Sequence, residues 1–181
     1  LNTSPEETAV CNLGSINLEK HITLDGKLDR ELLQKTVKTA IRMLDNVIDL
    51  NFYPTIEARN SNLKHRPIGL GIMGLQDVFF KLNLPFESPK ALNFSDQLLE
   101  FISYNAILTS SELAKERGSY ESFNGSKWDR GIFPLDTLSL LEKERKANIE
   151  INKITSLKWE EVRAKVKKYG MRNSNTIPIR Q

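Results

Sequence analysis

The chain has a single cysteine, Cys11, and this is the residue whose type offers the most chemistry. A thiol reacts as its thiolate, but no Lys, Arg or His stands close to Cys11 in the sequence to lower its pKa. One cysteine cannot close an internal disulfide, so a redox role needs a partner thiol from outside these residues. The other interpretation is a small buried side chain that only packs. The chemistry of the residue alone leaves both open.

Three glycines, Gly69, Gly71 and Gly74, have the spacing of a dinucleotide-binding fingerprint. That fingerprint must follow a strand, open a helix and be answered by an acidic residue about 20 positions later. Residues 64–67, which come directly before it, do not predict a strand, and Asp96 lies at a suitable distance but inside a helical pattern. We therefore expect these glycines to let a neighbouring helix approach a buried strand, and to bind no nucleotide.

The two histidines, His21 and His65, are far apart, and neither has a Cys or acidic residue at the spacing of metal ligands. We therefore expect no metal site. Neither histidine forms a Ser/His/Asp or Cys/His arrangement that the sequence can define. The basic cluster near the C-terminus lies among Glu160 and Glu161, which favours a solvated helix face over a phosphate-binding track. Its members are Lys165, Lys167, Lys168 and Arg172.

The first half of the chain predicts two strands and a long helix between them. Residues 8–18 alternate as a strand does, and a helix follows from an Asp29 cap, with apolar residues at helical spacing. Residues 51–67 contain Pro and Asn and predict a loop. Residues 68–75 are apolar and rich in glycine, so they predict a buried strand or a strand-to-helix junction, and residues 76–82 continue as a helix.

The second half predicts mostly helix. A Ser-Pro pair at residues 88–89 begins a helix that runs to about Arg117, with apolar residues on two faces, so we expect it to be buried on more than one side. Residues 118–134 predict a loop pinned by aromatic side chains, and helices are expected over residues 135–146 and 156–169. The fold class is therefore α/β and helix-rich, as in part of an α/β layer structure.

Composition sets the limits of function. Lys and Arg number 26 and Asp and Glu 23, so the net charge of 26 − 23 = +3 is too small to indicate a nucleic-acid or membrane partner. With 39% hydrophobic and 27% charged residues, the chain is globular rather than disordered. It has neither an apolar run long enough to cross a bilayer nor a secretory signal, so we expect a cytoplasmic location. It begins at Leu1 rather than Met, which suggests part of a longer protein.

Several long motifs resemble one family. Residues 7–18, Glu-Thr-Ala-Val-Cys-Asn-Leu-Gly-Ser-Ile-Asn-Leu, resemble the strand that carries a redox cysteine in the large, catalytic subunit of class I ribonucleotide reductase. Further stretches resemble the same family in the same order, at residues 51–75, 110–120 and 169–175. The resemblance covers residues 1–175, which we expect to be a partial barrel domain. Residues 176–181 are expected to be a tail where it stops.

This resemblance implies part of a ten-stranded α/β barrel and a reaction that reduces ribonucleoside diphosphates to deoxyribonucleotides for DNA synthesis. It implies that Cys11 is one of two reducing cysteines, the other lying on an earlier barrel strand. In the family, the radical cysteine lies upstream of Leu1 and the substrate-phosphate loop follows Asn175. The chain by itself is therefore expected to be inactive.

The resemblance also implies partners. No cofactor is expected in this chain, because the family's radical comes from a metal-containing small subunit and its ATP and dNTP effectors bind outside this segment. The implied partners are the rest of the large subunit, a second large subunit, the radical-generating small subunit, thioredoxin or glutaredoxin, and the ribonucleoside diphosphate. No nucleic acid and no membrane are expected. The alternative is a non-catalytic structural or assembly segment that retains the reductase sequence.

Overall fold

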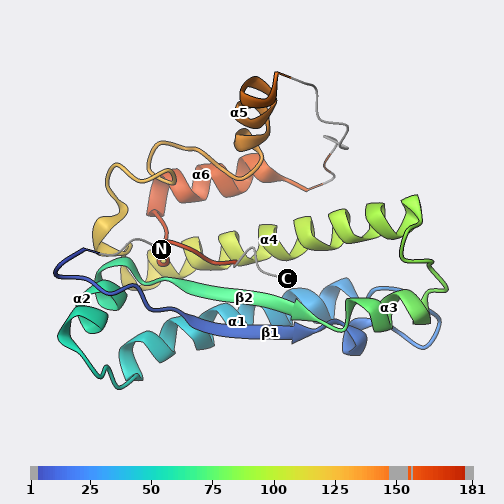
Figure 1. The fold of residues 1–181 in the computed structure, drawn as a ribbon, viewed down its shortest axis with the longest axis horizontal. Coiled ribbons are helices and arrows are strands. Elements are labelled where there is room, and N and C mark those ends of the chain that lie inside the picture. The colour runs from blue at the N-terminus through green and yellow to red at the C-terminus, as the bar shows by residue number, and fades with distance from the viewer. Residues whose placement is uncertain (1–3, 147–154, 156, 178–181) are drawn as a thin grey trace.

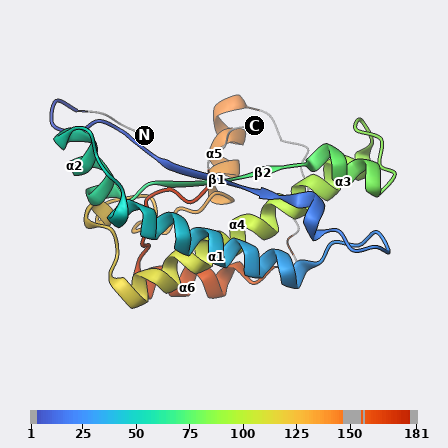
Figure 2. The ribbon, with the colours of Figure 1, turned by 90° about the horizontal axis from the view of Figure 1, so that it is seen from below.

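The computed structural model describes residues 4–146, 155 and 157–177. The first residue of the helix expected over 156–169 and residues 178–181 of the expected tail lie outside this part. Two parallel strands form one layer, and the long helices α1 and α4 lie behind them (Figures 1 and 2). The strands are β1 (Asn12–Asn17) and β2 (Ile68–Met73), and the helices are α1 (Arg30–Leu50), α2 (Ile56–His65), α3 (Leu75–Lys81), α4 (Pro89–Arg117), α5 (Asp136–Arg145) and α6 (Trp159–Tyr169).

The strand pair is parallel, with Asn12 opposite Ile68 and Asn17 opposite Met73. Parallel neighbours need a crossover, which α1 and α2 provide. Even-numbered positions of both strands face α1, and a Cβ added at Gly14 would lie 3.7 Å from the Leu44 side chain of that helix. Because side chains alternate along a strand, the odd-numbered positions face the side without helices. We call this the helix-free face.

Both expected strands are present, but β1 is shorter than the sequence predicts. It begins at Asn12, directly after Cys11, and the main chain of Thr8 instead donates a hydrogen bond to the carbonyl of Glu57 (3.2 Å). The other side of β2 is occupied by the C-terminal segment. The N–H groups of Ile68 and Leu70 donate to the carbonyls of residues 175 and 176, each at 3.1 Å. The main chain of β2 is therefore bonded on both sides.

The helix α1 forms as the sequence predicts. The Asp29 side chain accepts a hydrogen bond from the N–H of Leu32 (2.9 Å), which satisfies one of the free donors at the helix start. Its apolar stripe is buried against the strands and α4, and consists of Leu33, Val37, Ile41, Leu44 and Ile48.

The prediction of a loop over residues 51–67 is wrong, because α2 occupies most of that range. Thr55 caps α2 by accepting a hydrogen bond from the N–H of Ala58 (3.2 Å). The helix has no apolar stripe, and an apolar stripe is the pattern from which α1 and α4 are predicted. Tertiary hydrogen bonds hold it instead, among them one from the Asn62 amide to the Tyr53 hydroxyl (2.6 Å). It ends at Arg66, which adopts the left-handed conformation with φ 45°.

The long helix α4 is buried on two sides, as its two apolar faces predict. Ser88 caps its start and Gly118, at φ 84°, ends it. One face joins a core shared with α1 and the strands, through Leu98, Ile102, Ala106 and Leu113. The other face joins a second core with α6 and the aromatic loop, formed by Ile107, Tyr120, Phe133, Trp159, Val162, Val166 and Met171. The helix α4 therefore separates two hydrophobic cores.

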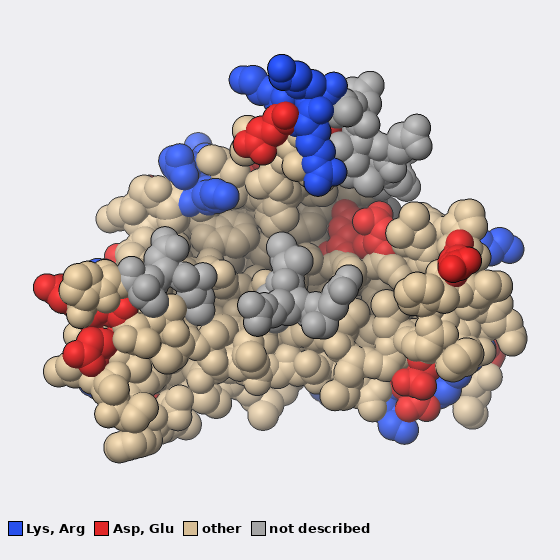
Figure 3. Space-filling model, viewed as in Figure 1, with Lys and Arg blue, Asp and Glu red and all other residues tan. Residues whose placement is uncertain are grey.

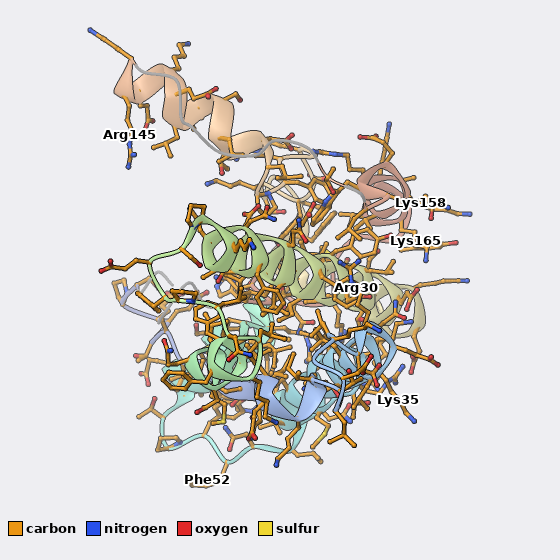
Figure 4. The ribbon with its side chains drawn as sticks, turned by 90° about the vertical axis from the view of Figure 1, so that its right-hand side faces the viewer. Arg30, Lys35, Phe52, Arg145, Lys158 and Lys165 are labelled. Carbon is orange, nitrogen blue, oxygen red and sulfur yellow. The ribbon has the colours of Figure 1, made fainter. Side chains whose placement is uncertain are left out.

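The aromatic loop after α4 is pinned as expected. The rings of Trp128 and Phe133 meet edge to face at 5.4 Å, and the Trp128 indole donates to the carbonyl of Ser174 (2.8 Å). The helix α5, in contrast, buries none of its residues and stands apart from the layers of α1 and α4 (Figure 4).

Candidate functional site

Cys11 is half-buried at the entrance to β1. Its Sγ lies 3.7 Å from the main-chain carbonyl of Asn12. Burial raises the pKa of the Cys11 thiol above its ordinary value. The thiol therefore stays protonated at neutral pH, as a cysteine with an ordinary pKa also does.

Cys11 stands one residue before β1, and continuing the alternation of the strand by that residue gives it the helix-free face. Leu13, two positions further, is 69% exposed on that face, and Met73 of β2 is 53% exposed. Residues two apart in extended chain lie on the same side, so Cys11 has the register position of Leu13. Figure 3 shows this side of the molecule, with charged side chains on α5, at the two ends and in one acidic group to the right of the centre.

The last turn of α2 binds the segment that leads to Cys11. One Glu7 carboxylate oxygen accepts from the Lys64 ammonium (2.6 Å), and the other lies 2.6 Å from Nε2 of His65. Nδ1 of His65 is in turn 2.6 Å from the Ser122 hydroxyl. The hydrogen bonds from Lys64 and then His65 lower the pKa of Glu7, so the carboxylate stays ionised at neutral pH.

Directly beside this turn, a carboxylate is buried among cations. Asp45 of α1 is fully buried and accepts hydrogen bonds from Arg66 (2.9 Å), Arg117 (3.1 Å) and the Asn173 amide (3.1 Å). Arg172 lies 3.4 Å from the same carboxylate. We call these residues the Asp45 cluster. It joins α1, the end of α2, the end of α4 and the C-terminal segment.

The Asp45 cluster corrects one expectation. The sequence predicts a solvated helix face for Arg172, but this residue follows α6 and points inward, donating also to the carbonyls of Arg117 and Gly118. The reason is that Gly170 ends the helix and turns the chain towards α4. Lys165 remains on α6 and forms an ion pair with Glu112 of α4 (3.1 Å) on the side that Figure 4 shows.

The glycine motif does not have the geometry of a dinucleotide fingerprint. Gly69 and Gly71 lie inside β2, and only Gly74, at φ 76°, occupies the turn before α3. A Cβ added at Gly71 would lie 3.3 Å from the hydroxyl of Ser15 on β1. The close neighbour of Gly71 is therefore a strand and not a helix, which corrects that part of the expectation.

The two histidines serve separate parts of the fold. His21 is buried, with Nδ1 2.9 Å from the carbonyl of Asn17 and Nε2 2.9 Å from the Thr36 hydroxyl. Among the described residues, no three His, Cys, Asp or Glu side chains are grouped so that they could hold a metal ion. No helix in the same part of the chain is long and apolar enough to cross a membrane.

Sequence reasoning missed Glu7, Ser122 and Asp45 as members of these clusters. Glu7 and Asp45 look like ordinary charged residues, and their partners are 57 and 21 or more positions away in the sequence. The only available signal was the run of three basic residues Lys64, His65 and Arg66 at the end of a polar segment. Such a run needs counter-charges once it is partly buried.

These features define a helix-rich α/β segment with a small parallel sheet and one cysteine at a strand entrance. A family model described as "Ribonucleotide reductase, barrel domain" matches residues 1–179, a range that extends past Asn175. The chain therefore belongs to the ribonucleotide reductase family and corresponds to part of the barrel domain of the large subunit.

Relatives from distant organisms agree with this. The chain is 57% identical over 180 residues to the ribonucleoside-diphosphate reductase subunit alpha of Chlamydia pneumoniae, covering 99% of this chain and 17% of that protein. It is 43% identical over 180 residues to the subunit alpha of Helicobacter pylori, covering 96% and 21%. It is 42% identical over 172 residues to the large chain of Schizosaccharomyces pombe, covering 95% and 20%. The chain thus spans about a fifth of the length of these relatives.

Proposed function

We propose that this chain forms part of the catalytic barrel of a ribonucleoside-diphosphate reductase large subunit, and that Cys11 supplies one of its two reducing thiols. The observation that carries the proposal is the position of Cys11. It lies within the matched barrel region, directly before β1, at a register position on the face without helices. The helices of an α/β barrel cover its outside, so the helix-free face is the one that turns towards the interior.

The proposed reaction balances with two thiols. Cys11 and a second cysteine each give up one hydrogen and join as a disulfide, so the pair loses two electrons and two protons. The ribose 2′-hydroxyl leaves as water and a hydrogen takes its place. Thioredoxin or glutaredoxin then reduces the disulfide by thiol–disulfide exchange. The raised pKa of Cys11 supports this role, because the thiol retains the proton that it must give.

The remaining parts of the reductase follow from the same proposal. The chain belongs to a ten-stranded barrel whose other strands come from elsewhere in the large subunit. The large subunit dimerises and works with a metal-containing small subunit that generates the radical, and ATP and dNTP effectors bind outside this segment. The location is the cytoplasm, where thioredoxin keeps thiols reduced.

The test uses the complete large subunit with its small subunit and thioredoxin. Cys11→Ser removes one reducing thiol with little change in volume, so substrate binding is expected to survive while deoxyribonucleotide production over many turnovers falls to background. Ser15→Ala, on the same face of β1, is the matched control and is expected to retain turnover. Normal turnover in Cys11→Ser would exclude the reducing role and favour the structural or assembly segment.

A further inference from the structure

We infer that Glu7 and His65 form a clamp that positions Cys11. The inference rests on the proposed role of Cys11, and it assigns positioning functions to residues that do not themselves react. We call Glu7, Lys64, His65 and Ser122 the Glu7 clamp.

The Glu7 clamp holds the chain at Glu7, four residues before Cys11. Both carboxylate oxygens of Glu7 are used, one by Lys64 and one by His65, each at 2.6 Å, and only 17% of the Glu7 side chain is exposed. Two charge-assisted hydrogen bonds on one carboxylate fix its position and its orientation. Four residues of extended chain span at most about 14 Å, so a shift at Glu7 is transmitted to Cys11 over a short tether.

Main-chain bonds support the same segment. Ser4 and Glu7 exchange hydrogen bonds across a tight turn, at 2.9 and 3.3 Å. The N–H of Thr8 then donates to the carbonyl of Glu57 on α2 (3.2 Å). The path into Cys11 is thus held against α2 by both its main chain and the Glu7 side chain.

The Glu7 clamp is connected to α1 and to the segment that runs beside β2. His65 is followed by Arg66, whose guanidinium is bound by Asp45 of the α1 core. The carbonyl of His65 accepts from the N–H of Ser174 (3.1 Å), at the start of the segment that runs beside β2. The last turn of α2 therefore fixes the position of the segment that leads into β1 and of the segment that lies along β2. A disulfide requires two Cα atoms 4.4–6.8 Å apart, so the placement of this entrance decides whether Cys11 reaches a partner.

A hydrolytic role explains the cluster less well. Ser122, His65 and Glu7 have the order of nucleophile, base and carboxylate. However, the described cavities of about 530 Å³ and 300 Å³ lie against α6 and between α1 and α4, and none of these three residues lines them. Lys64 also pairs with the Glu7 carboxylate, as a structural ion pair does.

The first experiment measures the alkylation rate of Cys11 by iodoacetamide in the complete large subunit, with the Cys11 peptide quantified by mass spectrometry. Glu7→Ala and His65→Ala are each expected to raise this rate by about threefold or more, because a released segment exposes the thiol and brings its pKa down towards the ordinary value. The double variant is expected to react no faster than the faster single variant, since the two residues act through one contact. Glu6→Ala, one position away and exposed, is the control and is expected to leave the rate unchanged.

Turnover separates this inference from the proposed function. If Cys11 is a reducing thiol, Glu7→Ala lowers kcat with thioredoxin and leaves the substrate KM unchanged, whereas Glu7→Asp, which keeps the carboxylate, recovers part of kcat. Should Cys11→Ser turn over normally, the reducing role fails, and the alkylation rates still report on the clamp. If either alanine variant disturbs folding, Ser122→Ala, which removes one outer bond, gives the same test with a smaller rate increase. An unchanged Cys11 alkylation rate in the folded Glu7 and His65 variants, or in the folded Ser122→Ala variant where these fail to fold, overturns the clamp.

Discussion

Asp45 and Arg66 face each other inside the protein, with Nη2 of the arginine 2.9 Å from a carboxylate oxygen and both side chains almost completely removed from water. Arg66 stands in the left-handed region at φ 45°, an unfavourable conformation for a residue with a side chain. The pair therefore does two things at once. It neutralises a buried charge, and it holds the chain between α2 and β2 in a turn that the backbone alone would avoid.

Removing one member of this pair should destabilise the protein strongly. Asp45→Ala removes the buried carboxylate that Arg66, Arg117 and Arg172 share and leaves Arg66 only the half-exposed Asp49, 2.7 Å away, so it is expected to lower the free energy of unfolding by about 3–5 kcal/mol. Urea denaturation followed by the fluorescence of Trp128 and Trp159 measures the change. The exposed ion pair of Lys27 and Asp25, which contacts no member of the Asp45 cluster, is the control, and Asp25→Ala should lower the free energy of unfolding far less. Equal costs for the two variants would contradict the central role of Asp45.

Gly71 should tolerate side chains poorly. Its missing Cβ would lie 3.3 Å from the Ser15 hydroxyl, so Gly71→Val is expected to lower the free energy of unfolding by about 1–3 kcal/mol through overpacking. Gly14→Ala on the opposite face has ordinary space, with its nearest contact at 3.7 Å, and should cost less. Thermal or urea unfolding provides the comparison. Saturable NAD or ATP binding that disappears in a folded Gly71→Val protein would show that the motif binds a nucleotide.

Acid should weaken the Glu7 clamp. Its partners lower the pKa of Glu7 in the folded protein, so the stabilisation is present above the ordinary glutamate pKa of about 4.3 and is lost as the pH falls through the lowered value. We therefore expect Glu7→Gln to be less stable than the wild type at pH 7 and the difference to shrink steadily below pH of about 4. Unfolding curves of both proteins across this range measure it. A difference that stays constant with pH would mean that the charge of Glu7 contributes nothing.

The chain alone should be inactive. In the proposed reductase the radical cysteine and the phosphate loop lie outside residues 1–175, so we expect the purified chain neither to bind nor to reduce ribonucleoside diphosphates. Equilibrium dialysis with a labelled diphosphate and an assay with a small subunit and thioredoxin test both points. Deoxyribonucleotide formed by this chain would contradict the assignment of those parts to other segments.

Local signals predicted some elements well and others not at all. The helices α1 and α4 each combine a capping side chain, Asp29 or Ser88, with an apolar stripe, so local and tertiary preferences agree. The helix α2 lacks the stripe and depends on bonds such as that between Asn62 and Tyr53, which no local pattern reveals.

In the candidate site, too, the sequence predicts one residue well and misses others. Cys11 stands out because it is the only cysteine and lies in a long motif that resembles a known family. The clamp could not be predicted, because the contact between Glu7 and His65 joins residues 58 positions apart. The inward direction of Arg172 could not be predicted either, because its contacts with Asp45 and the carbonyl of Arg117 join residues 127 and 55 positions apart.

The position of α4 between two cores has a consequence for how the molecule comes apart. Ala106 belongs to the core beside the strands and its immediate neighbour Ile107 to the core beside α6, so consecutive residues of α4 point into different cores. Each residue of an α-helix is rotated by about 100° from the last, and a single inserted residue would therefore turn both faces away from their cores together. We therefore expect the strand layer and the aromatic layer to unfold together, in a single transition.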